Sequence, residues 1–242
     1  MEGFLDLLSA PFMWLASFSP PDWLKYAIVT VALVVTVLIF WKNMKGVRLF
    51  HSRGWVDVVG GLMAGIVFGV LTGVLWAVFN PIIIVPPAIH LRLFSMLTAV
   101  VGIMFGPVSG FLTGYVATQV WAPIAGAYTP FHTPLADGIF VGLTGAIPAW
   151  LLRRGTLKEL WDQIQSDHRA WYLKTALVGL ASGLFMSFFV ALSLSVFTPL
   201  PFWLSFWAIG VVSDTGPLML MGPIVLKLME STRRAWSWMP QF

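Results

Sequence analysis

The chain has 242 residues, of which 58% are hydrophobic and only 10% are Asp, Glu, Lys or Arg. Soluble globular proteins are about half apolar or less, so this composition leaves no stretch polar and long enough for a soluble catalytic domain. The net charge of +4 is explained by basic residues that anchor the chain on the cytoplasmic side of a membrane, so no nucleic-acid partner is predicted. The absence of cysteine excludes disulfides and thiolate metal sites.

Three long stretches without any Lys, Arg, Asp or Glu indicate helices that cross a lipid bilayer. They are 58–91, 93–136 and 175–213. The hydrocarbon core of a bilayer is about 30 Å thick, and one helical pass through it takes about 20 residues. The apolar runs are continuous rather than alternating, which favours helices over a β-barrel. We therefore expect an all-α integral membrane protein.

In chain order, a smaller N-terminal region precedes a larger helical core. Residues 1–21 are mainly apolar, begin acidic and stop at Pro20-Pro21, which is typical of a short interfacial segment. An extra transmembrane helix and a basic cytoplasmic loop complete the N-terminal region, residues 1–53, and residues 54–242 form a six-helix core. The seven expected transmembrane helices are 23–41, 55–79, 92–105, 108–123, 135–152, 175–197 and 202–226.

The distribution of basic residues predicts the orientation of these helices. Cytoplasmic loops carry an excess of Lys and Arg. With the basic loop 42–53 placed in the cytoplasm, 12 of the 14 Lys and Arg residues fall inside, and Lys25 and Arg92 are the exceptions. We therefore expect the N-terminus outside and the C-terminus inside.

One further helix is expected in the cytoplasmic loop 153–174. Thr156 and Glu159 have the spacing of a capping box, in which each side chain bonds the other residue's backbone. The apolar residues that follow recur at helical spacing. We interpret this segment as a helix lying on the membrane surface.

Four glycines spaced four residues apart mark one face of the second transmembrane helix. Gly61, Gly65, Gly69 and Gly73, with Ala64 beside them, leave a bare groove into which another helix can pack closely. That helix belongs either to this chain or to a separate membrane subunit. These five residues are thus a candidate partner-helix interface, and internal packing is the open alternative.

Three short proline-rich loops are expected outside the membrane, at 80–90, 122–134 and 197–202. Proline at this density makes the connections stiff. Polar and aromatic side chains gather around them, and an apolar concavity with a few convergent polar groups is what a small-molecule site requires. The candidate substrate-binding residues are Asn80, His90, Arg92, Gln119, Trp121, Tyr128, His132, Asp137 and Asp214.

Two of these residues are acids placed within expected membrane helices. A carboxylate at such depth is costly unless it is paired, hydrated or protonated. Pro217 deprives the Ser213 carbonyl of its helical partner, so Asp214 lies either in a locally opened helix that forms part of a site, or in a kink where it bonds Ser213 or Thr215. Together with the aromatic residues, Arg92 and the two histidines, His90 and His132, would suit a planar ring that bears an anionic group.

The motifs of common enzyme classes are missing from the chain. Its four histidines do not have the spacing of HExxH or another metal-ligand motif, and no P-loop is present. Pro107-Val-Ser-Gly110 has a serine between small residues, but no histidine is placed near it. We therefore expect no enzymatic activity, no metal and no cofactor in this chain, and any energy from ATP must come from another chain.

Three glycine-containing motifs carry a resemblance to a known family. They are Phe105-Gly-Pro-Val-Ser-Gly-Phe-Leu-Thr-Gly114, Asp137-Gly-Ile-Phe-Val-Gly-Leu-Thr-Gly145 and the stretch from Val212 to Pro223. Over about 54–230 the chain resembles the substrate-binding S component of energy-coupling factor (ECF) vitamin importers. The extra N-terminal helix departs from the six-helix members, and the histidine near the start of the cobalt and nickel members is missing, which disfavours metal import.

The resemblance implies a multi-pass protein of a bacterial or archaeal inner membrane that binds a small vitamin-like micronutrient from outside. Its partners would be a transmembrane coupling (T) subunit, packed on the glycine-lined helix, and paired ABC ATPases that use ATP. The three proline-rich loops would close the substrate site. Two other classes stay open: a sensor input module of the multi-helix histidine-kinase type, and an accessory or assembly subunit of a larger membrane complex.

Overall fold

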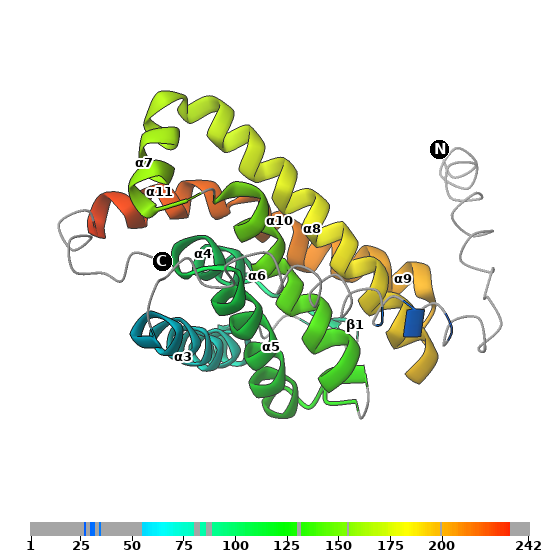
Figure 1. The fold of residues 1–242 in the computed structure, drawn as a ribbon. Coiled ribbons are helices and arrows are strands. Elements are labelled where there is room, and N and C mark those ends of the chain that lie inside the picture. Colours follow the sequence, from blue (N-terminus) through cyan, green and yellow to red (C-terminus); the bar gives the residue numbers. More distant parts are fainter. Residues whose placement is uncertain are drawn as a thin grey trace, which may run out of the picture.

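A computed structural model describes residues 55–79, 83–85, 89–129, 132–153, 155–198 and 200–232, together with the single positions 27, 30, 31 and 34. The described residues are mostly helical, with one short antiparallel hairpin (Figure 1). Apart from those four positions, the expected helix 23–41 and the rest of the N-terminal region lie outside the described residues, as does Asn80. The elements in chain order are α3 (Trp55–Phe79), β1 (Ile83–Val85), β2 (Ile89–His90), α4 (Met96–Phe105), α5 (Pro107–Ile124), η1 (His132–Asp137), α6 (Gly138–Leu152), α7 (Leu157–Ser166), α8 (His168–Phe197), α9 (Phe202–Trp207), η2 (Ala208–Asp214), α10 (Thr215–Met219) and α11 (Met221–Thr232).

Among the described residues, four helical stretches are long and apolar enough to cross a membrane. They are Val59–Phe79, His132–Leu152, His168–Val196 and Phe202–Thr232. The helix α4 has ten residues, which at about 1.5 Å per residue cover about half of the hydrocarbon thickness. The described residues are therefore mostly helical and compatible with a membrane protein. The number of seven membrane helices and their orientation stay predictions from the sequence.

The helix α5 lies between α3 and α6, and glycines allow both neighbours to come close (Figure 1). On one side, Ser109 Oγ in α5 donates a hydrogen bond of 2.7 Å to the carbonyl oxygen of Gly61 in α3. On the other side, a Cβ added to Gly110 of α5 would lie 2.7 Å from the carbonyl oxygen of Gly145 in α6. Small residues are what brings membrane helices together, since lipid tails are as apolar as leucine.

The glycine face of α3 is therefore internal, and the predicted partner-helix interface is corrected. A Cβ added to Gly65, Gly69 or Gly73 would lie 2.7–2.8 Å from atoms of α5, so α5 fills the groove. Gly61 is buried against the same helix through its carbonyl oxygen, and Ala64 beside it is half-buried. A separate subunit cannot occupy this face while α5 packs there.

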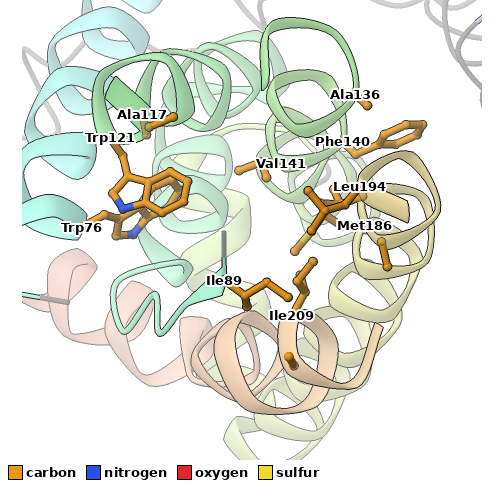
Figure 2. Packing of buried hydrophobic residues seen from close by; sticks show 14 of the residues in the cluster. Trp76, Ile89, Ala117, Trp121, Ala136, Phe140, Val141, Met186, Leu194 and Ile209 are labelled. Atoms are coloured by element: carbon orange, nitrogen blue, oxygen red, sulfur yellow. The ribbon is translucent and has the colours of Figure 1, made fainter. Parts of the chain in front are cut away.

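Among the described residues, buried apolar side chains form two clusters. The first, drawn in Figure 2, joins α3, β2, α5, η1, α6, α8 and η2; its members include Trp76, Ile89, Trp121, Phe140, Leu194 and Ile209. The second includes Leu157, Leu160 and Ile164 of α7, together with residues of α4, α8 and α11. The bundle thus covers the apolar stripe of α7, and the location of this helix on the membrane surface stays a prediction.

The helix expected within residues 153–174 nevertheless begins as predicted. Glu159 Oε2 accepts from the backbone N–H of Thr156 at 2.9 Å, and Thr156 Oγ1 accepts from the N–H of Glu159 at 3.3 Å. These reciprocal bonds form the predicted capping box, which satisfies backbone donors at the start of the helix.

Arg153 fixes the end of α6 to the end of α4. Its guanidinium is buried and donates from Nη1 to the carbonyl oxygens of Ile103 (3.1 Å) and Met104 (2.8 Å) in the last turn of α4. Burial lowers the pKa of Arg153 to about 10, which leaves the side chain protonated at neutral pH. A positive charge at the carboxyl end of a helix is favourable because the helix dipole is negative there.

Candidate functional site

Two π-helical segments carry three of the ionisable residues that the sequence singled out. The segment η1 leads into α6 and contains His132 and Asp137, and η2 leads into α10 and ends at Asp214. Pro134 within η1 has no N–H to donate, which is one reason why regular α-helical bonding fails there. Such segments are rare and often occur at functional sites.

Arg92 and Asp137 form a buried ion pair. Arg92 Nη2 donates to Asp137 Oδ2 at 3.2 Å, and both residues are at most 7% exposed. The guanidinium carbon also lies 4.2 Å from the ring centroid of Trp121 and 5.2 Å from that of Trp76, within the range of cation–π attraction. Arg92 is therefore held inside the bundle by one acid and two indole rings.

Asp214 is tied to the segment between β2 and α4. Ser95 Oγ, at the N-cap of α4, donates a hydrogen bond to Asp214 Oδ1. The neighbouring Ser213 Oγ donates to the carbonyl oxygen of His90 at 2.8 Å and accepts from the backbone N–H of Arg92 at 3.1 Å. These bonds hold residues 90–95, which follow the β1–β2 hairpin, against η2. The bonded residues are more than a hundred positions apart in the sequence.

Both histidines of the cluster are buried and have defined neighbours. His132 Nδ1 lies 2.9 Å from Ser193 Oγ of α8. The ring of His90 stands edge-on to Trp121, with their ring centroids 5.5 Å apart. Neither histidine is a solvated loop residue, although both lie next to proline-rich segments.

These side chains surround a small polar cavity of about 20 Å³. A volume of this size has room for about one water molecule. One part of the lining is polar, and an apolar wall from β2, α8 and η2 forms the other part. We call the polar part the polar cluster; it consists of His90, Arg92, His132, Asp137, Ser213 and Asp214. The lining residues are Ile89, His90, Arg92, Trp121, Ala127, His132, Asp137, Val190, Leu194, Ile209, Ser213 and Asp214.

Six of the nine predicted substrate-binding residues line this cavity: His90, Arg92, Trp121, His132, Asp137 and Asp214. The other three do not. Gln119 Nε2 donates a hydrogen bond to the carbonyl oxygen of Thr133 at 3.2 Å and so supports η1 from outside the cavity. Tyr128 is 49% exposed. Asn80 lies outside the described residues.

Sequence reasoning missed the serines that complete the polar network. Ser95 and Ser213 connect α4, β2 and η2, and Ser193 contacts His132. Ser213 carried a usable signal, because it precedes an acid inside an apolar helix and lies four residues before a proline. Ser95 and Ser193 stand among ordinary apolar residues, and no pattern distinguishes them.

Four buried atoms of residues that line the cavity have no hydrogen-bond partner among the described residues. They are Arg92 Nη1, Trp121 Nε1, Asp137 Oδ1 and Asp214 Oδ2. Leaving a buried polar atom unpaired costs about 1–3 kcal/mol, and more for a charged group. Two donors and two acceptors are thus available to whatever occupies the cavity.

The described residues contain no group of three His, Asp or Glu side chains arranged to hold a metal ion. Comparisons with protein-family models, with curated proteins and with solved structures found no match for this chain. The function is therefore inferred from the geometry of the cavity and from the sequence patterns.

Proposed function

We propose that this chain is the membrane-embedded substrate-binding subunit of an ECF-type importer. It takes a small vitamin-like micronutrient from the outside and delivers it inward together with a transmembrane coupling subunit and paired ATPases. The observation that carries the proposal is the cavity lined by Arg92, Asp137 and Asp214, whose charged atoms are only partly satisfied by the protein.

The energetic cost of this cluster is the reason for assigning it a function. Burying an ion costs several kcal/mol even in a good pair, and apolar residues of similar volume often stabilise a fold equally well or better. Ionisable residues inside an apolar helical bundle therefore mark a functional site by default. Aromatic walls with few polar groups are typical of small-ligand sites, and Trp76 and Trp121 supply such a wall here.

Binding of a micronutrient requires the cavity to enlarge. Sites for small organic ligands measure about 300–1,000 Å³, against about 20 Å³ here. The hairpin that carries Ile89 and His90 is tied to Ser213 by hydrogen bonds of 2.8 and 3.1 Å. Each such bond contributes about 1 kcal/mol net, whereas a micromolar ligand binds with about 8 kcal/mol. A ligand of ordinary affinity can therefore displace this hairpin.

The proposal keeps the orientation predicted from the basic residues and changes the expected docking surface. The hairpin and the loop near Ala127 would face the exterior, and α7 and Arg153 the cytoplasm. Because α5 fills the glycine face of α3, the coupling subunit would contact another surface of the bundle.

One observation favours a second candidate, an accessory subunit of a larger membrane complex. The cavity has room for only about one water molecule, which is also what a purely structural polar cluster would show. In that case the ion pair would only fix the position of α4 against η1 and η2.

Capture of the tagged full chain from its native membranes separates the two candidates. We expect two ATPases and a membrane subunit to co-purify, and native mass spectrometry to detect one bound small molecule. The small molecule should be lost in the paired variant Arg92→Met/Asp137→Leu, which removes both charges at similar volume, and kept in the control Arg169→Met/Asp162→Leu on the exposed cytoplasmic side. Recovery of neither ATPases nor a small molecule would contradict the proposal and support the accessory role.

A further inference from the structure

The formal charges of the acids and the arginine around the cavity do not balance. When both acids are ionised, Asp137 and Asp214 contribute two negative charges against the one positive charge of Arg92, which leaves one excess negative charge in the lining. A buried unbalanced charge costs several kcal/mol, because the low-dielectric surroundings replace water. The cavity therefore favours an occupant that brings one positive charge.

The hydrogen-bonding atoms point to the same kind of occupant. Arg92 is already committed to Asp137 through Nη2 and to the faces of Trp76 and Trp121. Asp137 Oδ1 and Asp214 Oδ2 are acceptors without a partner among the described residues, and Asp214 itself is 2% exposed and lines the cavity. The unpaired donors of the lining, Arg92 Nη1 and Trp121 Nε1, carry no negative charge, so a cationic group is drawn to the two carboxylate oxygens.

We infer that the solute bound in this cavity is a cation whose positive group carries N–H donors, such as a protonated amine or an amidinium. This inference rests on the proposed function and names the substrate class of the same site. The N–H groups bond Asp137 Oδ1 and Asp214 Oδ2, and the neighbouring indole of Trp121 adds cation–π attraction. An ammonium head is about as large as the water molecule for which the cavity has room. The rest of the solute would occupy the space left when the β1–β2 hairpin is displaced.

The formal charges of the lining also argue against a ligand with an anionic group, which the sequence suggested. An anion would raise the excess to two negative charges and would face two carboxylates, while the arginine meant to receive it is already paired. A proton on one of the acids would also neutralise the cluster. In that case a neutral solute or a water molecule would fill the cavity, and binding would show no preference for cations.

Binding to the purified full chain, measured by thermal shift and isothermal titration, tests the inference. The probes are water-soluble vitamins grouped by charge, with the isosteric set benzamidine, benzamide and benzoate and the set pyridoxamine, pyridoxine and pyridoxate. We expect the tightest binder to be a cation, and Asp214→Asn to weaken it by roughly 10- to 100-fold, the range of a lost charge-assisted hydrogen bond. Its neutral isostere should be affected less than threefold.

The controls keep the two proposals separable. Asp162→Asn, the same change at an exposed position of α7, should leave the affinity unchanged, and Asp214→Glu should keep the preference for cations. If Asp214→Asn does not fold, the ranking of the probes on the native chain still decides. A neutral or anionic tightest binder, or a cation affinity unchanged by a folded Asp214→Asn, overturns this inference and leaves the proposed function standing. Binding of no probe at all contradicts the proposed function itself.

Discussion

The replacement of Gly69 by alanine tests the close packing of α3 against α5. An added Cβ at this position would lie 2.7 Å from Val116 Cβ, 3.0 Å from Val116 Cγ1 and 3.1 Å from the carbonyl oxygen of Thr113. Carbon atoms in contact are ordinarily 3.5–4.0 Å apart. A β-branched side chain on a helix has essentially one rotamer, so Val116 cannot turn away. The two helices must therefore separate by several tenths of an ångström.

The expected cost follows from two opposing effects. Overpacking of a close contact destabilises by about 1–3 kcal/mol, and the higher helix propensity of alanine returns up to about 1 kcal/mol. The net loss in the free energy of unfolding is about 1–2 kcal/mol. For a chain of this size, that corresponds to a fall in Tm of roughly 2–8 °C.

Thermal unfolding of the purified protein in one detergent measures this effect, with Gly216→Ala as the matched control. Gly216 is exposed in α10, and no neighbouring atom lies within 4 Å of its added Cβ. The Tm of Gly216→Ala should therefore stay the same or rise by up to about 4 °C, through the higher helix propensity of alanine. An unchanged Tm in Gly69→Ala would refute the packing of α3 on α5. If the variant keeps its Tm but fails to co-purify with other membrane subunits, the glycine face serves docking after all.

Three further changes test other contacts of the structure. Asp137→Leu alone should cost about 3–5 kcal/mol of unfolding free energy, because it leaves a buried unpaired charge, and adding Arg92→Met should restore most of that loss. Arg153→Met should cost about 1.5–3 kcal/mol through the hydrogen bonds that it donates to α4, with chemical unfolding as the measurement. Thr156→Ala should cost about 1 kcal/mol, because α7 loses its capping box.

Each of these changes has a counterpart at an exposed position. Arg169→Met and Ser166→Ala should both be nearly silent, within about 0.5 kcal/mol. A double variant no more stable than Asp137→Leu would show that Arg92 and Asp137 do not form the pair described here. If Arg153→Met behaves like Arg169→Met, the link between α6 and α4 contributes nothing to stability.

The helix boundaries that depend on local sequence were predictable. The expected helix 55–79 coincides with α3, because Asn80-Pro81 in the sequence marks the end of the helix. The turn before α5 was also expected, and Gly106 adopts a positive φ of 107° there, which glycine permits without strain. The capping box of α7 follows from two residues at fixed spacing.

Features that depend on contacts between distant residues were not predictable. A single helix was expected over 202–226, but the chain forms α9, η2, α10 and α11 in succession, and η1 was likewise unforeseen. Periodicity does not distinguish π-helical from α-helical bonding, since both keep side chains at helical spacing. Arg92 was placed at the start of a membrane helix, whereas α4 begins at Met96 and Arg92 lies before it, paired with an acid 45 residues away.

Most residues of the candidate site could be predicted from the sequence, but the shape of the cavity and the contacts between its residues could not. Uncharged surroundings made His90, Arg92, Asp137 and Asp214 conspicuous, and all four line one cavity. Its volume and the partners of each polar atom depend on how helices pack in three dimensions, and the serine contacts depend on the same packing. The sequence-based preference for an anionic ligand did not take into account that Arg92 is paired with Asp137.

The central claim is that this cavity receives a solute from the exterior, and cysteine labelling at Ala127 tests it most directly. Ala127 is half-buried and lines the cavity, and the chain has no other cysteine to react. In intact cells that carry Ala127→Cys, a membrane-impermeant maleimide should label the protein, and the micronutrient identified by the binding measurements should protect it. Labelling only after the cells are permeabilised, or labelling at the same rate with and without the micronutrient, would contradict the account.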